Sequence, residues 1–365
     1  MKKYIHNHRI LYLLLVVCLT SIFIASCHKK DSELVVNGPA PTPKLPSQLF
    51  QYQSMNNSLA TLGRVLFYDR NLSLNNAISC GSCHIQQYAF ADNHQFSRGL
   101  NNGYTSRNAS AILSSFNHNK FWDGRAGNFD TAVFMPVTNH LEMDVFNLNM
   151  LPEKLSYLSY YPDLFNSAFG TPEITVNGIR KALASFVGNL YSTNSKYDRG
   201  NLTAIEQEGE NVFHGNGRCY NCHSGPNFNG YQTAYENIGL DYTYPDKGRG
   251  NISHNSTDDG KFAVPTLRNI ALSAPYMHDG RYKTLREVID HYSDGIQDSK
   301  NLSWVFRDFS DAGNMMVSTI DSSNFYILPV SLPNLTENEK TALEAFLKTL
   351  TDVSFVADPK FSNPF

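Results

Sequence analysis

The chain has 365 residues, a formal net charge of −3, 41% hydrophobic residues and 17% charged residues. This length is enough for about two domains of ordinary size, and the hydrophobic share is enough for a sizeable core. There is no basic stripe and no long run of like charge, so nucleic-acid binding has no electrostatic support and we expect no nucleic acid as a partner.

The N-terminal segment is typical of an export signal. Basic residues precede an apolar run over residues 10–25, which is short for a membrane span and fits the core of a signal peptide. The run ends in Ile24-Ala25-Ser26-Cys27, which resembles a bacterial lipobox, so we expect residues 1–27 to be a lipoprotein signal that ends at a lipidated Cys27. The alternative is an ordinary signal peptide in which Cys27 is incidental. We expect an exported chain that meets the membrane through this anchor alone, on the periplasmic side of the outer membrane or on the cell surface of a Gram-negative bacterium.

Helical patterns follow a predicted tether. Residues 28–52 contain a Pro-rich run and predict an extended segment. Apolar residues at helical spacing over residues 59–66 precede the first cysteine motif, and the same spacing recurs over residues 343–350. A helical pattern with Glu206, Glu210 and the Val212-Phe213 pair leads into the second cysteine motif. Residues 202–206 have the pattern of a capped helix start. Strand-like alternation is scarce, which indicates a mainly α fold.

Two Cys-x-x-Cys-His motifs carry the chemistry. They consist of Cys80, Cys83 and His84 in the first copy, and of Cys219, Cys222 and His223 in the second. Such a motif attaches haem c through two thioethers and places its histidine on the iron. The rivals are a zinc site, which normally needs four ligands, and a thioredoxin-like redox pair. Two copies in an exported chain, each with an adjoining histidine, favour haem.

We therefore predict a mainly α fold of two cytochrome c-like domains, each with one covalently bound haem c, joined by long connecting loops. The boundary is expected just before the capped helix start. The predicted ranges are 53–198 for the N-terminal haem domain, 199–352 for the C-terminal haem domain and 353–365 for a C-terminal tail.

From about residue 59 to residue 352 the chain resembles the bacterial di-haem cytochrome c peroxidase family, which includes the MauG-type enzymes. The matching segments are 62–69, 80–84, 89–92, 121–126, 219–226, 237–240, 264–269, 274–280 and 347–352. The resemblance implies two cytochrome c-like domains with a calcium ion at their interface. It also implies that peroxide meets the N-terminal haem and that the C-terminal haem transfers electrons.

The resemblance bears on whether the first haem is open. Family members that need reductive activation have a histidine that caps the peroxidatic iron, and Leu100 stands at that position here. Leucine cannot bind iron, so the resemblance implies a first haem that is five-coordinate or holds only water. His94 is the alternative cap, although a lone loop histidine more often faces solvent.

The resemblance also assigns residues of the first haem pocket. Trp122 corresponds to a tryptophan that lies between the haems and carries electrons or holes; its alternative role is a buried aromatic anchor. Glu142 corresponds to a distal acid that can move a proton between the peroxide oxygens; its alternative role is a surface glutamate at a helix end. Pro136 matches the pocket proline, whereas Ala132 replaces a glutamine and removes a hydrogen-bond donor.

The resemblance also bears on which residue is the sixth iron ligand of the second haem. Tyr292 stands where activation-dependent peroxidases have a methionine and MauG-type enzymes have an axial tyrosine. Met277 is the main competitor, His291 a weaker one, and a merely packed Tyr292 is also an alternative. A thioether raises the haem potential, whereas a phenolate stabilises higher oxidation states.

The same resemblance implies a calcium site. The matched ligands are the side chain of Asn108 and the backbone carbonyls of Ser273 and Pro275, with waters completing the shell. Oxygen ligands suit this hard cation.

The expected reaction is reduction of hydrogen peroxide to water, with electrons from a small cytochrome c or another exported redox protein. A MauG-like enzyme that oxidises tryptophan or other residues of a partner protein is the first alternative. A non-catalytic electron-transfer cytochrome is the second alternative. The resemblance also allows a homodimer.

Overall fold

The computed structural model describes residues 42–44, 57–113, 121–230, 235–308 and 329–365, all within the compact unit Thr42–Phe365. The predicted signal with Cys27, and most of the predicted tether, lie outside the described residues. No helix in the described part is long and apolar enough to cross a membrane.

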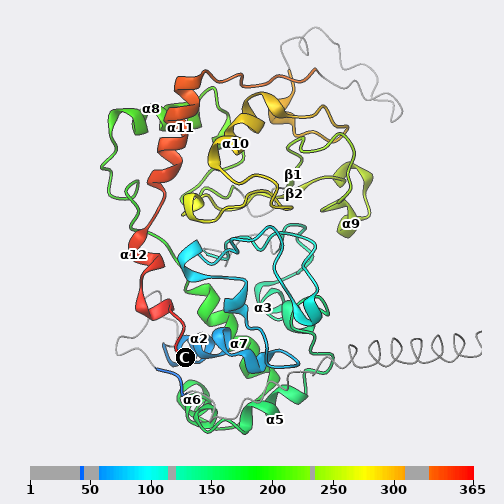
Figure 1. Ribbon diagram of the computed structural model, residues 1–365, viewed down its shortest axis with the longest axis vertical. Coiled ribbons are helices and arrows are strands. Elements are labelled where there is room, and N and C mark those ends of the chain that lie inside the picture. The colour runs from blue at the N-terminus through cyan, green and yellow to red at the C-terminus, as the bar shows by residue number, and fades with distance from the viewer. Residues whose placement is uncertain (1–41, 45–56, 114–120, 231–234, 309–328) are drawn as a thin grey trace, which may run out of the picture. The chain divides into compact units, whose positions relative to one another are not determined.

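Helices and loops make up most of the described chain, so the predicted mainly α class is confirmed (Figure 1). The longer helices are α2 (Asn57–Tyr68), α6 (Tyr160–Phe169), α7 (Val176–Gly188), α8 (Ala204–His214) and α11 (Glu337–Thr349). The shorter ones are α3 (Phe129–Ala132), α4 (Met135–Thr138), α5 (Met150–Ser156), α9 (Gly250–Ser253), α10 (Leu285–Asp290) and α12 (Val353–Val356). Two strands, β1 (Tyr235–Glu236) and β2 (Phe262–Ala263), pair antiparallel with Glu236 opposite Phe262.

Three helices begin with the same capping box, in which a threonine and a glutamate satisfy each other's backbone N–H groups. The pairs are Thr203 with Glu206 at α8, Thr284 with Glu287 at α10, and Thr336 with Glu339 at α11. The capped start predicted at residues 202–206 is therefore confirmed.

A close helix crossing with a glycine at the contact occurs twice. Helix α2 packs on α7, and α8 packs on α11 (Figure 1). A Cβ on Gly63 of α2 would lie 1.9 Å from the carbonyl oxygen of Ala182 in α7. A Cβ on Gly209 of α8 would likewise lie 1.9 Å from the carbonyl oxygen of Ala342 in α11. Because glycine has no side chain, it lets the two backbones approach this closely.

Phenylalanines repeat the same arrangement beside each crossing. The ring centroids of Phe67 and Phe186 lie 5.1 Å apart, and those of Phe213 and Phe346 lie 5.3 Å apart. Each pair belongs to a buried core of its own. We call the part built on α2 and α7 the first lobe, and the part built on α8 and α11 the second lobe.

The C-terminal residues 353–365 pack on the first lobe. Phe355 and Phe361 belong to the core of the first lobe. The hydroxyl of Tyr68 in α2 also donates to the carbonyl oxygen of Phe361 at 2.6 Å. The segment predicted as a tail after the second domain therefore helps to close the first lobe.

The glycine crossings give a stability prediction. Gly209→Ala is expected to lower the free energy of unfolding by about 1–3 kcal/mol, because the new methyl group overlaps the backbone of α11. Urea unfolding of the haem-loaded protein, followed by helical circular dichroism, measures the change. Gly127→Ala is the matched control, since a Cβ there meets nothing within 4 Å, and it should change stability by less than about 0.5 kcal/mol. Equal stability of the two variants would contradict the steric argument.

Candidate active site

The first Cys-x-x-Cys-His motif forms one wall of a cavity of about 500 Å³. A 3₁₀ turn covers Cys80–Ser82, and the backbone N–H of His84 donates to the carbonyl oxygen of Cys80 at 2.9 Å. This local turn brings Cys80, Cys83 and His84 into the lining of the same cavity.

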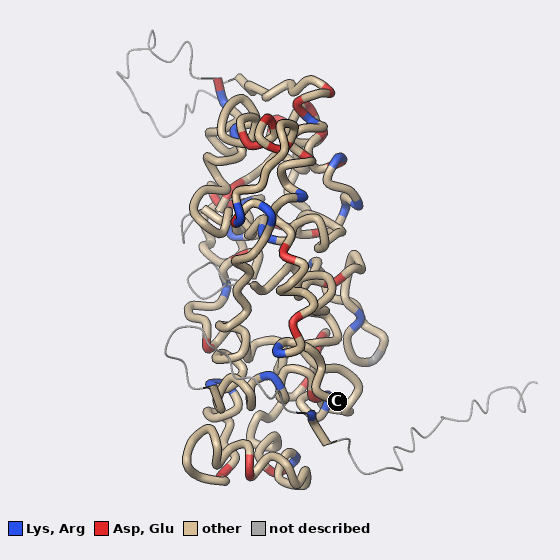
Figure 2. Tube along the Cα trace, turned by 90° about the vertical axis from the view of Figure 1, so that its left-hand side faces the viewer, with Lys and Arg blue, Asp and Glu red and all other residues tan. Residues whose placement is uncertain are grey.

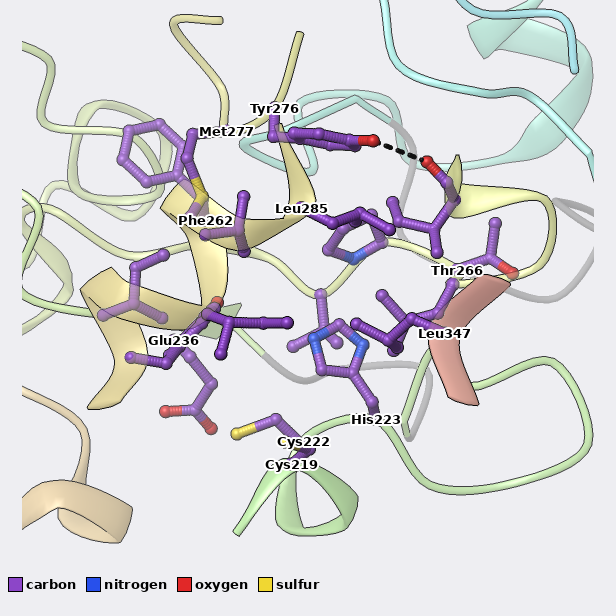
Figure 3. Close-up of a pocket in the computed structure, with 18 of the residues that line it drawn as sticks. Cys219, Cys222, His223, Glu236, Phe262, Thr266, Tyr276, Met277, Leu285 and Leu347 are labelled. Atoms are coloured by element: carbon purple, nitrogen blue, oxygen red, sulfur yellow. Dashed lines mark hydrogen bonds between the residues drawn. The ribbon is translucent and has the colours of Figure 1, made fainter. Parts of the chain in front are cut away.

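The second motif repeats this geometry around a cavity of about 180 Å³. A 3₁₀ turn covers Cys219–Asn221, and the backbone N–H of His223 donates to the carbonyl oxygen of Cys219 at 2.8 Å. Figure 3 shows Cys219, Cys222 and His223 on one side of this cavity and Met277 on the other. Most of the other lining side chains are apolar.

Both motif histidines are oriented by a backbone carbonyl. The Nδ1 atom of His84 lies 2.8 Å from the carbonyl oxygen of Phe90, and that of His223 lies 2.9 Å from the carbonyl oxygen of Phe228. A carbonyl only accepts, so Nδ1 carries the hydrogen and the Nε2 lone pair is left for a metal. Burial lowers the pKa of both imidazoles, which favours the neutral form that binds iron.

The chemistry of the cysteines fits haem c better than a thioredoxin-like redox pair. Burial raises the pKa of the Cys83 thiol to about 11 and of the other three motif thiols to about 12. A thioredoxin-like pair depends on a lowered thiol pKa instead. None of the four cysteines forms a disulfide with another described residue. Paired free thiols, an oriented imidazole and a largely apolar cavity are what covalently bound haem requires.

Glu142 lines the first cavity together with the first motif. The side-chain amide of Asn139 donates to Glu142 Oε1 at 2.6 Å and orients the carboxyl. Burial raises the pKa of Glu142, while the Asn139 hydrogen bond and the Arg125 charge oppose the rise without cancelling it. A positioned carboxyl with a raised pKa suits proton transfer near neutral pH. Ala132 and Pro136 also line this cavity.

Two residues were considered at the place of the capping histidine, Leu100 and His94, and neither lines the first cavity. Leu100 is buried but does not line it, and the backbone N–H of Leu100 donates to the carbonyl oxygen of Glu142 at 3.2 Å. The side chain of His94 is 73% exposed, with Nδ1 2.9 Å from Asp92 Oδ1. Among the described lining residues His84 supplies the only imidazole.

Trp122 lies in the wall that the two cavities share. Its indole N–H donates to the carbonyl oxygen of Asn108 at 2.9 Å. Its own carbonyl oxygen accepts from the backbone N–H of Ala263 in β2 at 2.8 Å. The structure therefore holds Trp122 from both lobes.

Arg107, which the sequence reasoning did not single out, ties the lobes together beside Trp122. Its guanidinium binds both carboxylate oxygens of Asp246, at 2.6 and 2.8 Å, and Asp123 Oδ2 at 2.5 Å. Asp123 follows Trp122 in the chain, so Arg107 positions the segment that carries the shared tryptophan. Burial alone would raise the pKa of Asp246, but hydrogen bonds from Arg107 and from a backbone N–H outweigh burial and lower it.

This ion pair gives a pH-dependent prediction. Arg107→Gln is expected to lower the free energy of unfolding at neutral pH by about 1–3 kcal/mol. The folded-state pKa of Asp246 lies below the unfolded value of about 3.9. Its stabilisation is therefore present above the unfolded value and is lost as pH falls through the folded pKa. The stability gap between variant and wild type should close on acidification, as measured by urea unfolding at a series of pH values.

The control for this prediction is Lys348→Gln, which breaks an exposed pair with Glu344. This change should cost less than about 1 kcal/mol at every pH. A gap for Arg107→Gln that stays constant down to acid pH would show that the pair with Asp246 is not its cause.

Tyr292 and Met277 both line the second cavity. Tyr292 lies in a π-helical turn, His291–Gly295, which continues α10 and is a rare backbone form that is frequent at functional sites. Burial raises the pKa of the Tyr292 phenol well above its usual value. His291 does not line the cavity, and its Nε2 lies 2.9 Å from the carbonyl oxygen of Ile238.

The three residues proposed for calcium, Asn108, Ser273 and Pro275, belong to the lining of the second cavity. The Asn108 amide nitrogen donates to the carbonyl oxygen of His94 at 3.0 Å, and its amide oxygen accepts no hydrogen bond from the described residues.

Comparisons with known proteins identify the family. The family model described as di-haem cytochrome c peroxidase matches residues 57–204. The cytochrome c551 peroxidase of Nitrosomonas europaea is 36% identical over 247 residues, which cover 64% of this chain and 72% of the relative. The chain belongs to the di-haem cytochrome c peroxidase family.

Members of the MauG type are also similar. The methylamine utilization protein MauG of Methylorubrum extorquens is 30% identical over 299 residues, which cover 79% of this chain and 77% of the relative. The crystal structure of a MauG-like protein associated with microbial copper homeostasis matches with a TM-score of 0.74 and 30% sequence identity. That match covers 91% of this chain and 99% of the other. Membership of the di-haem family implies haem c as the cofactor.

Proposed function

We propose that this chain is a di-haem c-type peroxidase that reduces hydrogen peroxide to water with electrons from an external redox protein, such as a small cytochrome c. The observation that carries the proposal is the pair of cavities, each with its own Cys-x-x-Cys-His turn, that share Trp122 in their walls. One haem c would be held by residues 53–198 and the other by residues 199–352, each through the thiols and the histidine of its motif.

Haem c, when bound, supplies the iron that binds peroxide and exchanges electrons. In the first cavity Glu142 accepts a proton from one peroxide oxygen and returns it to the other, which favours cleavage of the O–O bond. Asn139 keeps the carboxyl in place for both transfers. No second described histidine lines the cavity to compete with peroxide.

The second cavity is the electron-transfer site of the proposal. Trp122 carries electrons between the cavities. Its indole N–H donates to the carbonyl oxygen of Asn108 and its backbone carbonyl accepts from Ala263, which together hold the residue between the lobes. Tyr292 would help to hold the haem iron of this cavity, with Met277 as its competitor. Asn108, Ser273 and Pro275 would hold one calcium ion through oxygen atoms, which such a cation prefers.

The proposal includes an exported enzyme anchored through lipidated Cys27, on the periplasmic side of the outer membrane or at the cell surface, and capable of forming a homodimer. Lys and Arg residues are interspersed with Asp and Glu along the described chain (Figure 2). This distribution contains no basic stripe of the kind that nucleic-acid binding requires.

Mass spectrometry of the intact chain and absorption and EPR spectra before and after one equivalent of hydrogen peroxide test the proposal. Two covalently attached haems, one of them high-spin, and immediate reaction without prior reduction are expected. Fewer than two haems, or a protein inert to peroxide in every redox state, would refute it. Two low-spin haems that react only after one-electron reduction would keep the peroxidase but require a capping ligand on the first iron.

A MauG-type oxidation of residues in a partner protein is the second candidate. It is favoured by Tyr292 in the lining of the second cavity, because a phenolate ligand stabilises higher oxidation states. An oxidised state that persists after peroxide and decays on adding a partner protein would favour this candidate. Rapid decay with a soluble cytochrome donor would favour the peroxidase.

A further inference from the structure

Glu236 is a carboxylate in the wall of the second cavity with no role in the reaction described so far. It lies in β1 directly opposite Phe262 of β2, and residues opposite each other in an antiparallel pair project to the same face. Both side chains line the second cavity. Figure 3 shows Glu236 on the same side of the cavity as Cys222. The strand pair therefore presents a carboxylate to the site where the second haem would be attached.

The described residues provide Glu236 with no hydrogen-bonding or ion-pairing side chain. The other full charge in the wall is Arg218, whose guanidinium donates at 3.0 Å to the carbonyl oxygens of Val305 and Ser331. Arg218 is thus turned to the backbone and does not neutralise Glu236. Burial is the main cause of the raised pKa values of Cys222 and Tyr292, and the negative charge of Glu236 adds to both.

We propose that Glu236 lowers the reduction potential of the haem in the second cavity. A fixed negative charge beside a haem stabilises the oxidised over the reduced iron, because reduction adds one electron and no compensating charge. The effect acts in the same direction as an anionic Tyr292 ligand and keeps the second site able to hold oxidising equivalents. The inference depends on one part of the proposed function, which is the attachment of haem at Cys219 and Cys222.

The experiment is a spectroelectrochemical titration of the haem-loaded full chain at constant pH. Glu236→Gln is expected to raise the midpoint potential of the second haem. At a fixed applied potential, the ratio of reduced to oxidised second haem should then be about tenfold larger than in the wild type. Glu236→Asp keeps the charge and should remain close to the wild type. Glu208→Gln, which removes an exposed charge from α8 outside both cavities, should change nothing.

The outcomes separate this inference from the proposed function. Intact mass and the haemochrome spectrum first establish two haems per chain; their absence from the wild type would refute the di-haem assignment itself. With both haems present, an unchanged potential in Glu236→Gln would overturn the role of Glu236. An equal rise in Glu236→Gln and Glu236→Asp would overturn it too, because local packing and not charge would be the cause. If Glu236→Gln loses haem, Glu236→Ala makes the same change of charge and takes its place.

Discussion

Replacing Glu142 with glutamine is expected to slow the reaction with hydrogen peroxide by about 10²–10⁴-fold while both haems stay attached. Glutamine keeps the size of the side chain and can still accept the hydrogen bond from Asn139, but it cannot take up a proton. Stopped-flow mixing of the resting protein with peroxide measures the rate constant. An unchanged rate would show that Glu142 does not transfer the proton.

The pH profile provides a second readout of the same variant. Because burial raises the pKa of Glu142, the wild-type rate should rise with pH along a limb above the usual glutamate value of about 4.3. That limb should be missing from Glu142→Gln. The matched control is Glu153→Gln, an exposed glutamate of α5 outside the cavity, which should keep both the rate and the limb.

Replacing Tyr292 with phenylalanine is expected to change the absorption spectrum of the second haem and to raise its midpoint potential by about 0.1 V or more. Axial ligands set haem potentials over a range of about 0.8 V, and this change removes the proposed phenolate ligand. Redox titration together with EPR of the ferric protein measures both effects.

Met277→Leu is the comparison that decides between the two candidate ligands. Both side chains line the second cavity. Tyr292→Phe and Met277→Leu each remove a possible iron ligand with little change in side-chain volume. If Tyr292 is the ligand, Met277→Leu should leave the spectrum of the second haem unchanged. A spectrum altered by Met277→Leu and unaffected by Tyr292→Phe would instead make the thioether the ligand and weaken the MauG-type alternative.

Several features of the molecule could be predicted from local sequence because their physical cause is local. Cys-x-x-Cys-His places two thiols and an imidazole within one turn of the chain, and both copies line cavities. The capping box at Thr203 needs only its own helical turn. Trp122 and Glu142 came from family resemblance, and both line the first cavity.

Other features could not be predicted, because they depend on which distant segments fold against each other. No local pattern near Arg107 indicates that its partner is Asp246, more than a hundred positions later. Residues 353–365 follow the second domain in the chain, yet Phe355 and Phe361 complete the first core. Glu236 reaches the second cavity only because β1 pairs with β2.

The sequence by itself thus determined the helical class and the family and predicted haem attachment at the two Cys-x-x-Cys-His motifs, since these follow from short spacings and ordered motifs. Only the tertiary structure decided which residues share a cavity. It placed Trp122 between the two sites, left His94 outside the first cavity and set the Glu236 carboxylate beside Cys222. The physical reason is that burial, charge proximity and hydrogen-bond partners are properties of packed surfaces, which short-range sequence patterns do not encode.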